Sequence, residues 1–214
     1  MPPRGRPRTF DRAEALQRAM EVFWALGYEG TTVQDLQKAM GGITPTSLYA
    51  AFGSKEKLFR EAVELSARTI GAPPMLAFTS GATARASIEG MLRAYVASVC
   101  LPGKPRGCLL VLGAINCTQG NHQVQAHLRS LRQLRPRFIK ERLERGLAEG
   151  DVPKGTNLDQ LASFYTAVMN GLSVQARDGA PREELLANVD CAMAAWDAVV
   201  GKRSGKRPTG SPAA

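Results

Sequence analysis

The sequence predicts an all-α protein with a three-helix amino-terminal head, which contains a helix-turn-helix, and a larger carboxy-terminal helical bundle. Apolar residues recur every three or four positions nearly throughout the 214 residues, and no segment shows the alternation of a β-strand. Glycine and proline residues divide this pattern into two very short segments and several longer ones. The apolar share of 44% and the charged share of 22% are those of an ordinary globular chain.

The first two helices are predicted from their ends. We expect the first to begin at Asp11, which can form a capping box with Glu14, and to stop at Gly27 in a left-handed C-terminal cap. Thr32 is the next capping residue, and the glycine pair at 41–42 ends the second helix after about two turns.

The next two helices also carry their own start signals. Thr44 is a cap, and Pro45 occupies the first helical position, where its missing N–H has no partner to lose. Leu48 and Phe52 are four residues apart and face inward, and Ser54 caps the fourth helix. Two short helices joined by a glycine turn indicate a helix-turn-helix unit. Because neither short helix is stable alone, the longer helices on either side must hold them.

Longer helical segments follow the proline pair at 73–74, and we expect Pro136 to kink or split one of them. The predicted helices of this part are residues 82–100, 106–118, 121–148, 157–177 and 181–200. The predicted organisation is a basic arm at 1–9, the helix-turn-helix head at 10–54, a connecting helix at 55–72, the bundle at 73–200 and a disordered basic tail at 201–214.

The formal net charge of +9 is concentrated at the two ends of the chain. The arm contains Arg4, Arg6 and Arg8, the tail contains two Lys and two Arg residues, and neither segment contains an acid. Basic ends of this kind are typical of arms that reach a phosphate backbone, which favours nucleic acid as a partner. For the tail, an effect on solubility alone is the alternative interpretation.

Several classes of function have no support in the sequence. No apolar run approaches the roughly 20 residues of a membrane helix, and no signal peptide is present, so we expect a cytoplasmic protein. No nucleophile elbow, phosphate loop or dinucleotide fingerprint occurs, so we expect neither an enzyme nor a cofactor. The four cysteines form no C-x-x-C pair, and His122 and His127 are five residues apart, so we expect no metal site. The cysteines are expected to be small buried hydrophobes.

Several short motifs occur together in the head: Gly27-Tyr28, Thr31-Thr32-Val33, Asp35-Leu36, Gly42-Ile43-Thr44, Ser47-Leu48-Tyr49, Phe52 and Ser54-Lys55-Glu56. As a set they resemble the DNA-binding head of the tetracycline-repressor (TetR) family of bacterial regulators, and the resemblance covers residues 10–65. One departure is visible, because the turn Met40-Gly41-Gly42 has one residue more than the usual alanine-glycine turn of that family. An extra residue at this point can tilt the following helix.

The third helix is the predicted recognition helix. Its amino-terminal end, led by Thr44 and Pro45, directs free N–H groups at a phosphate-lined major groove. Thr46, Ser47 and Tyr49 carry hydroxyls that can bond to base edges or phosphates. Packing is the alternative role for the Tyr49 ring.

Further DNA contacts are predicted outside that helix. Lys55, at the start of the fourth helix, is a phosphate contact that the resemblance implies, and Thr32 and Gln34 complete the predicted set. The arm, with Arg4, Arg6 and Arg8, is expected to enter the adjacent minor groove.

The resemblance implies a dimer formed by the last two helices and an effector pocket among the middle ones. The predicted dimer contacts are apolar residues of 157–177 and 181–200, namely Val168, Leu172, Leu186, Val189, Met193 and Trp196. The core of a monomeric bundle is the alternative role for them. The predicted pocket residues, for which ordinary core packing is the alternative, are Leu92, Tyr95, Val96, Cys108, Leu112, Phe138, Phe164 and Met169.

Cys108 carries a second hypothesis. In the run Arg106-Gly107-Cys108-Leu109 it looks like the cysteine that some relatives use to sense electrophiles. A neighbouring arginine and a helix N-terminus would make its thiol more reactive. Inert packing is the alternative interpretation, and we expect the other three cysteines to lie buried in helices.

These observations predict a ligand-responsive, dimeric transcriptional regulator, a repressor that a small-molecule effector releases from a palindromic operator. The alternative is a non-regulatory, architectural nucleic-acid-binding protein that uses its basic tails. A regulator binds one operator on the order of 10³-fold or more tightly than random DNA, whereas a tail-driven binder shows no such ratio.

Overall fold

Every regular element is a helix in the computed structural model, which describes residues 11–200. The head consists of α1 (Arg12–Gly30), α2 (Val33–Ala39) and α3 (Pro45–Phe52), and α4 (Lys55–Thr69) leads out of it. The bundle consists of α5 (Ala72–Ser80), α6 (Ala84–Val99), α7 (Leu109–Leu112), α8 (His122–Glu149), α9 (Leu158–Arg177) and α10 (Arg182–Val199), with a 3₁₀ turn at Gln119–Asn121. The predicted all-α class is confirmed.

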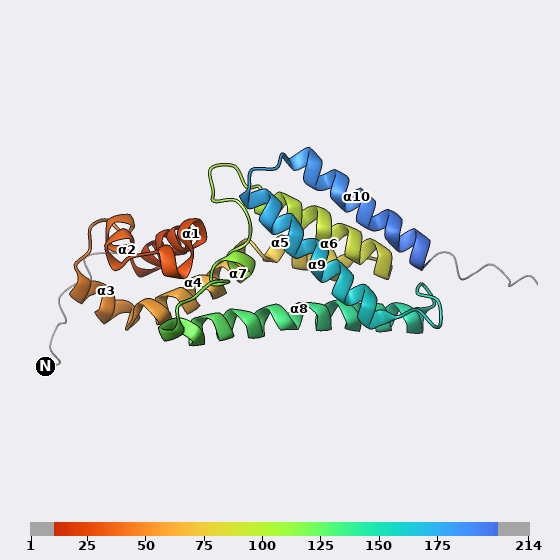
Figure 1. The fold of residues 1–214 in the computed structure, drawn as a ribbon, viewed down its shortest axis with the longest axis horizontal. Coiled ribbons are helices and arrows are strands. Elements are labelled where there is room, and N and C mark those ends of the chain that lie inside the picture. The colour runs from red at the N-terminus through yellow and green to blue at the C-terminus, as the bar shows by residue number, and fades with distance from the viewer. Residues whose placement is uncertain (1–10, 201–214) are drawn as a thin grey trace, which may run out of the picture.

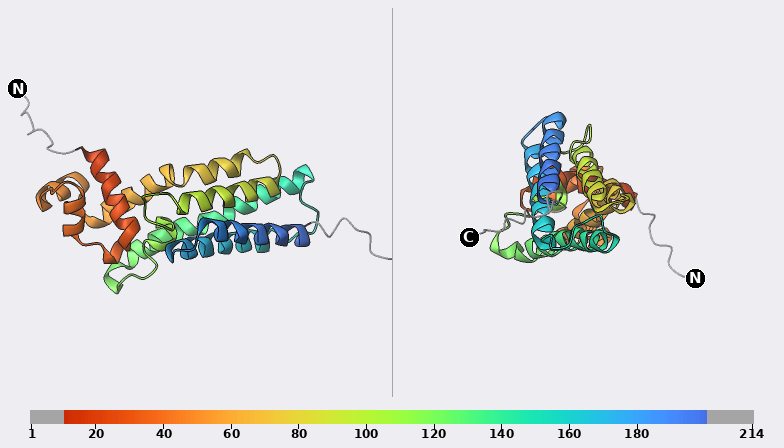
Figure 2. Two further views of the ribbon diagram at one scale, coloured as in Figure 1. Left: turned by 90° about the horizontal axis from the view of Figure 1, so that it is seen from above. Right: turned by 90° about the vertical axis from the view of Figure 1, so that its right-hand side faces the viewer.

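The head and the bundle form one elongated molecule (Figure 1). Helices α1, α2 and α3 lie at one end, and α10 finishes at the other. Helix α8 runs along most of the length, so its first turns pack on the head and the remainder packs on the bundle. The views in Figure 2 show α5 beside α6 and α9 beside α10.

Side-chain caps begin the head helices, as predicted. The Asp11 carboxylate accepts hydrogen bonds from the N–H groups of Ala13 and Glu14, at 2.8 and 3.3 Å. Glu14 pairs with Arg18 instead of returning to the cap, so only half of the predicted capping box forms.

The caps of the following helices are complete. Thr32 and Asp35 form a capping box in which each side chain accepts the other residue's backbone N–H. Thr44 caps α3 and Ser54 caps α4, in both cases by accepting the N–H three residues on. These three predictions are confirmed.

Helix α1 differs from its prediction at Gly27. This residue has φ +71° and ψ 176°, a backbone conformation available almost only to glycine, so the helix breaks there. The helix then resumes and ends at Gly30. The positive φ was expected, but the expectation that Gly27 is a left-handed cap ending the helix is wrong.

The bundle contains two departures from the predicted helices. Residues 72–80 form α5, a helix that was not predicted. This helix can contain two prolines because they lie in its first turn, where a missing N–H loses no hydrogen bond. The predicted helix at 106–118 shrinks to the four residues of α7, since Gly107 has φ +83° and helical geometry stops after Leu112.

Helix α8 continues through Pro136, so the predicted split of this segment is wrong. Leu128 before the proline and Ile139 after it are both fully buried. The helix is therefore held on both sides of Pro136 by tertiary packing, which outweighs the loss of one backbone hydrogen bond.

Two apolar clusters form the core, and they do not follow the predicted domain boundaries. The first is centred on the rings of Phe23, Tyr28 and Phe59, with Phe59 5.0 and 5.1 Å from the other two. It also contains Val124 and Leu128 of α8, so the core of the head includes residues far along the chain. The second cluster fills the bundle between α5, α6, α8, α9 and α10.

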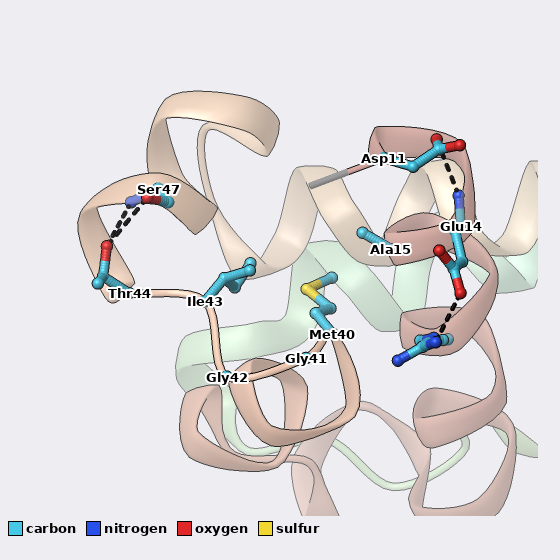
Figure 3. Close-up of a pocket in the computed structure, with 10 residues that line it drawn as sticks. Asp11, Glu14, Ala15, Met40, Gly41, Gly42, Ile43, Thr44 and Ser47 are labelled. Carbon is cyan, nitrogen blue, oxygen red and sulfur yellow. Dashed lines mark hydrogen bonds and ion pairs between the residues drawn. The ribbon is translucent and has the colours of Figure 1, made fainter. Parts of the chain in front are cut away.

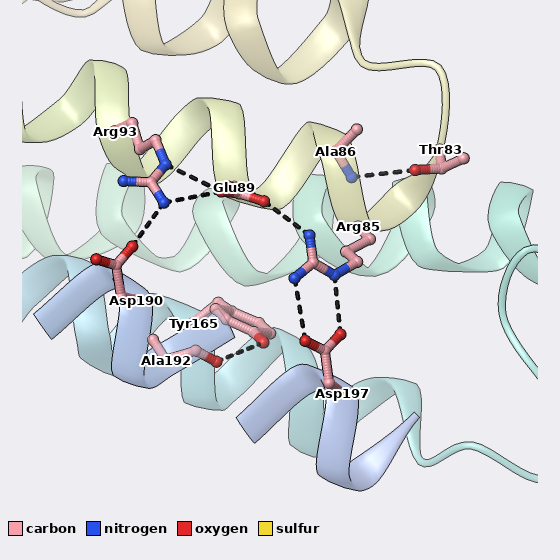
Figure 4. Close-up of polar contacts among 9 residues, drawn as sticks. All are labelled: Thr83, Arg85, Ala86, Glu89, Arg93, Tyr165, Asp190, Ala192 and Asp197. Carbon is pink, nitrogen blue, oxygen red and sulfur yellow. Dashed lines mark hydrogen bonds and ion pairs between the residues drawn. The ribbon is translucent and has the colours of Figure 1, made fainter. Parts of the chain in front are cut away.

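A ladder of ion pairs clamps α6 to α10 (Figure 4). Arg85 forms a two-point contact with Asp197, at 2.9 and 3.1 Å, and also pairs with Glu89 at 2.7 Å. Arg93 bridges Glu89 and Asp190, at 2.9 and 2.6 Å. The Arg85 guanidinium lowers the pKa of the Asp197 carboxyl by hydrogen bonding to it. These exposed pairs orient α10 more than they stabilise the fold.

A buried arginine closes the end of the bundle that is farthest from the head. The side chain of Arg142 is 4% exposed, and its Nε donates to Ser87 Oγ at 2.9 Å. Its Nη2 lies 3.9 Å from the Asp151 carboxylate and 3.5 Å from the Gly81 carbonyl. Asp151 in turn accepts the N–H of Ala84 at the start of α6. The guanidinium therefore links α8 to the beginning of α6.

None of the helices within residues 11–200 is both long and apolar enough to cross a membrane. In the same residues, no three His, Cys, Asp or Glu side chains gather in a way that would hold a metal ion.

Replacing Arg142 by methionine should lower the free energy of unfolding by about 3 kcal/mol, because the change leaves Asp151 without its buried cation. Urea denaturation followed by circular dichroism measures the loss. The control is Arg145→Met, which removes an exposed cation that pairs with Glu149 in the same helix and should cost less than ~0.5 kcal/mol. Equal losses for the two variants would contradict the structural role of Arg142.

Candidate nucleic-acid interface

The polar face of α3 is exposed at the end of the molecule, away from the bundle (Figure 1). Leu48 and Phe52 point into the head and are 0% and 3% exposed, as predicted. Thr46 is exposed on the opposite side, and Tyr49 is 43% exposed. The Tyr49 ring therefore does not serve as a core residue of the head.

Some of the hydroxyls on this face already make hydrogen bonds within the protein, and others do not. Thr44 accepts the N–H of Ser47 at 3.2 Å and also bonds to its hydroxyl at 3.0 Å, so these two side chains hold the start of α3. Thr32 is likewise engaged with Asp35 in the capping box of α2. Among the predicted hydroxyl contacts, Thr46 and Tyr49 are the side chains that make no hydrogen bond within the described residues.

The remaining predicted DNA contacts lie in three different environments. Gln34 and Pro45 are exposed on the outer surface of the head. Lys55 is half-buried, with its ammonium 4.3 Å from the centre of the Tyr28 ring, and this burial lowers the pKa of the lysine. The three arginines of the arm, at positions 4, 6 and 8, fall outside the described residues, as does the tail at 201–214.

The extra glycine of the turn is accommodated by the backbone (Figure 3). Gly41 and Gly42 both have positive φ, +86° and +77°, and a methyl group at either would meet no atom within 4 Å. The turn needs glycine for its conformation and not for space. Met40 remains 4% exposed, so the insertion does not lift the turn off the core.

A polar hollow of about 540 Å³ lies between this turn and the first turns of α1 (Figure 3). It is lined by the α1 residues Asp11, Glu14, Ala15 and Arg18 and by residues 40–44 and Ser47. Arg18 crosses it and donates to the Ala39 carbonyl at 3.3 Å. This arrangement ties the amino-terminal half of α1 to the helix-turn-helix.

The carboxy-terminal half of α1 is bonded to the bundle. At the Gly27 break, the N–H of Tyr28 donates to the Gly113 carbonyl at 2.7 Å instead of continuing the helix. Trp24 donates from its ring nitrogen to the Gly107 carbonyl at 2.8 Å. The α1 helix is therefore hydrogen-bonded to the segments on either side of α7.

Two side chains add to this connection. Arg177, in the last turn of α9, donates to the carbonyls of Trp24 and Ala25 at 2.5 and 2.8 Å. Glu29 accepts from the backbone and hydroxyl of Thr118 and from Asn121, at 2.7, 2.9 and 2.9 Å. These bonds lower the pKa of the Glu29 carboxyl. We call this group of contacts the α1 junction.

Sequence reasoning missed the α1 junction. Arg177 reads as an ordinary basic residue near a helix C-terminus, and Glu29 reads as a surface acid. The only sequence features that mark these contacts are two glycines, Gly27 and Gly107. In the structure both have a positive φ, and the backbone turns there to meet its hydrogen-bond partner.

The predicted pocket residues are not all brought together. Leu92, Val96 and Met169 are buried in the bundle with Tyr95, and Leu112 and Cys108 are half-buried. Two others, Phe138 and Phe164, are 45% and 39% exposed at the surface, so their assignment to an internal pocket is wrong. Apolar periodicity marks a helix face, but it does not tell which neighbour that face meets.

Several expectations about the cysteines are also wrong. The Arg106 guanidinium contacts the sulfur of Cys100 at 3.3 Å and the carbonyls of the loop before α10, and makes no hydrogen bond to Cys108. Cys108 instead donates its backbone N–H to Ser173 Oγ at 2.9 Å. Cys100 is half-buried at the end of α6, Cys117 lies in a loop and Cys191 is exposed, whereas all three were expected to be buried in helices.

Most of the predicted dimer contacts face the core of their own chain. Leu172, Val189, Met193 and Trp196 are at most 4% exposed within one protomer, so they cannot present side chains to a partner, and their assignment is wrong. Val168 and Leu186 are half-buried. The alternative of a bundle core is the correct one for the four buried residues.

Two family models match most of the chain. The model described as bacterial regulatory proteins, tetR family, matches residues 15–62, and the model for the tetracyclin repressor-like C-terminal domain matches residues 84–187. The chain belongs to the TetR family. The resemblance of the head motifs is thereby confirmed, and members of this family are regulators of transcription.

Relatives within the TetR family align over nearly the whole chain. The HTH-type transcriptional repressor ComR of Escherichia coli is 31% identical over 92% of this chain and 94% of its own. A cysteine mutant of the TetR family regulator CifR, in a complex with 26-bp operator DNA, is 46% identical, covers 89% of this chain and 100% of its own, and has a TM-score of 0.86. A TetR regulator from Rhodococcus sp. RHA1 is 39% identical over 87% and 97% of the two chains, with a TM-score of 0.57.

Replacing Tyr49 by alanine should weaken the binding of cognate DNA by about 1–3 kcal/mol, because the exposed ring and hydroxyl lie on the recognition helix. A fluorescence-anisotropy titration measures the loss. The control is Phe138→Ala, which removes an exposed aromatic side chain from α8. Unchanged affinity for a folded Tyr49→Ala variant would remove this residue from the interface.

Replacing Arg177 by methionine should weaken DNA binding by about 0.5–2 kcal/mol without any change at the DNA surface, because the carbonyls of Trp24 and Ala25 lose their partner. Faster hydrogen exchange at the carboxy-terminal half of α1 should accompany the loss. Arg182→Met is the control, since Arg182 is exposed at the start of α10. Wild-type exchange and wild-type affinity in Arg177→Met would show that the α1 junction does not position the head.

Proposed function

We propose that this protein is a homodimeric repressor of the TetR family that binds a palindromic operator in the cytoplasm and is released from it by a small-molecule effector. The observation that carries the proposal is the exposed polar face of α3, with Thr46 and Tyr49 free, on a head that the α1 junction holds against the bundle. A recognition helix that is fixed relative to the dimer can read two half-sites at one spacing.

The relatives support this proposal over an architectural protein that binds through basic tails. ComR is named a repressor, and the CifR structure contains operator DNA. A regulator also needs no catalytic constellation, which agrees with the proposal that the chain is not an enzyme. Titration of purified protein against its best genomic fragment and against random DNA tests the choice. A ratio on the order of 10³ or more supports the regulator, and a ratio near one contradicts it.

For the dimer we propose a surface of exposed apolar residues in place of the buried ones predicted from the sequence. On α9, Phe164 and Val174 are 39% and 42% exposed and flank the exposed Gly171. On α10, Val199 is 55% exposed, and with Phe164 and Ala195 it lines a shallow hollow of about 140 Å³. These exposed apolar side chains lie on two adjacent helices, and Gly171 has no side chain to hold a second copy away, as a close twofold contact requires.

Phe164→Asp should convert the dimer to a monomer and abolish tight operator binding, because it places a charge at the centre of the proposed twofold contact. Size-exclusion chromatography with light scattering measures the mass. Leu76→Asp is the matched control, since Leu76 is 69% exposed on α5. A dimeric Phe164→Asp protein that still binds the operator would contradict this assignment.

A further inference from the structure

Three arginines in the middle of α8 have no acidic partner within the described residues. Arg129, Arg132 and Arg135 are three residues apart, so successive members are neighbours on the helix. Arg132 and Arg135 are half-buried. Arg132 donates to the Leu110 carbonyl at 3.1 Å, and Arg135 donates to the Asn170 side-chain oxygen at 3.2 Å. Among residues 11–200, none of the three takes part in an ion pair.

Three cations nearer the end of the same helix are paired, whereas the exposed Arg137 makes no ion pair within the described residues. Lys140 contacts Asp159 at 2.7 Å, and Arg145 contacts Glu149 at 3.2 Å. Arg129 and Arg135, on either side of Arg132, carry the same sign of charge. Burial, together with these two charges, lowers the pKa of Arg132. The positive charge at this point is therefore only partly buried and not offset by the protein.

A buried tyrosine lies beside one of these cations, Arg135. The guanidinium of Arg135 is 5.7 Å from the centre of the Tyr95 ring, and Tyr95 is 4% exposed. The Tyr95 hydroxyl is fully enclosed, and the side chains of Cys108 and Ser173 lie close enough to interact with it. Within the described residues, however, it makes no hydrogen bond of good geometry. A buried hydroxyl without a partner costs about 1–3 kcal/mol, so a retained one needs an explanation.

We propose that Tyr95, Arg132 and Arg135 bind the acidic group of an organic anion, and that this anion is the effector of the proposed repressor. The inference rests on the proposed function. Guanidinium groups match the oxygens of a carboxylate or a phosphate ester, and the tyrosine hydroxyl supplies a further donor. The apolar side chains packed around Tyr95, which include Val96 and Met169, would move apart to receive the body of the molecule.

The rate at which the Cys108 thiol is alkylated can test this site even when the effector is unidentified. Iodoacetate and iodoacetamide alkylate a thiolate in the same way, with loss of iodide, and differ chiefly in charge. Cys191, which is exposed on α10, gives the reference ratio in the same sample. We expect the iodoacetate-to-iodoacetamide rate ratio to be about 3–10-fold higher at Cys108 than at Cys191, and to fall as salt is added.

Two variants connect the ratio to the arginines. Arg135→Met should bring the Cys108 ratio down to that of Cys191, whereas Arg137→Met, which removes an exposed cation two positions away, should leave it unchanged. Circular dichroism checks that both variants are folded. An equal ratio at the two cysteines, no alkylation of Cys108 by either reagent, or a ratio unaffected by Arg135→Met would overturn the proposal.

Competition with small amphiphiles distinguishes a carboxylate from a phosphate ester as the preferred acidic group. Octanoate and octyl phosphate should slow alkylation of Cys108 in the wild-type protein more than octanol does, and the stronger of the two identifies the preferred acidic group. Equal protection by octanol, or protection by none of the three, counts against an anion site. Operator binding is measured separately on the same samples. A protein that lacks a specific operator overturns the proposed function, while the alkylation ratios still decide whether the anion site exists.

Discussion

The position of the head depends on the break in α1 at Gly27. An interrupted helix leaves backbone N–H and C=O groups without intrahelical partners, and these must be satisfied elsewhere when they are not exposed to water. In this protein the Tyr28 N–H donates a hydrogen bond to the Gly113 carbonyl, and the Trp24 carbonyl accepts one from the Arg177 side chain. The groups that the break releases are the same groups that hold two distant segments of the bundle against the head.

Local chemistry was sufficient to predict the head. Thr32, Thr44 and Ser54 each carry the side-chain oxygen that begins a helix, and the turn glycines at 41–42 end one, so α2, α3 and α4 could be located from neighbours in sequence. Local signals could not predict that α7 is only four residues long. This short length depends on bonds that Gly107 and Gly113 make to Trp24 and Tyr28 more than 80 positions earlier.

The same distinction applies to the candidate sites. Exposure of Thr46 and Tyr49 follows from a short amphipathic helix, whereas Arg177 and Glu29 have partners 153 and 89 positions away, which no local pattern indicates. The four buried residues assigned to the dimer show a further limit. Apolar periodicity predicts that Trp196 faces a helix, but a neighbour in the same chain and a partner subunit satisfy that pattern equally well.

The α1 junction has a consequence for building hybrid sensors from proteins of this type. An exchange of residues 11–54 between relatives follows the sequence motifs, yet it would separate Trp24 and Glu29 from Gly107, Thr118 and Arg177. The physically self-contained unit is larger and discontinuous, since it includes the loops around α7 and the last turn of α9. A transplanted head would retain its sequence preference and lose its fixed orientation unless those distant residues were moved with it.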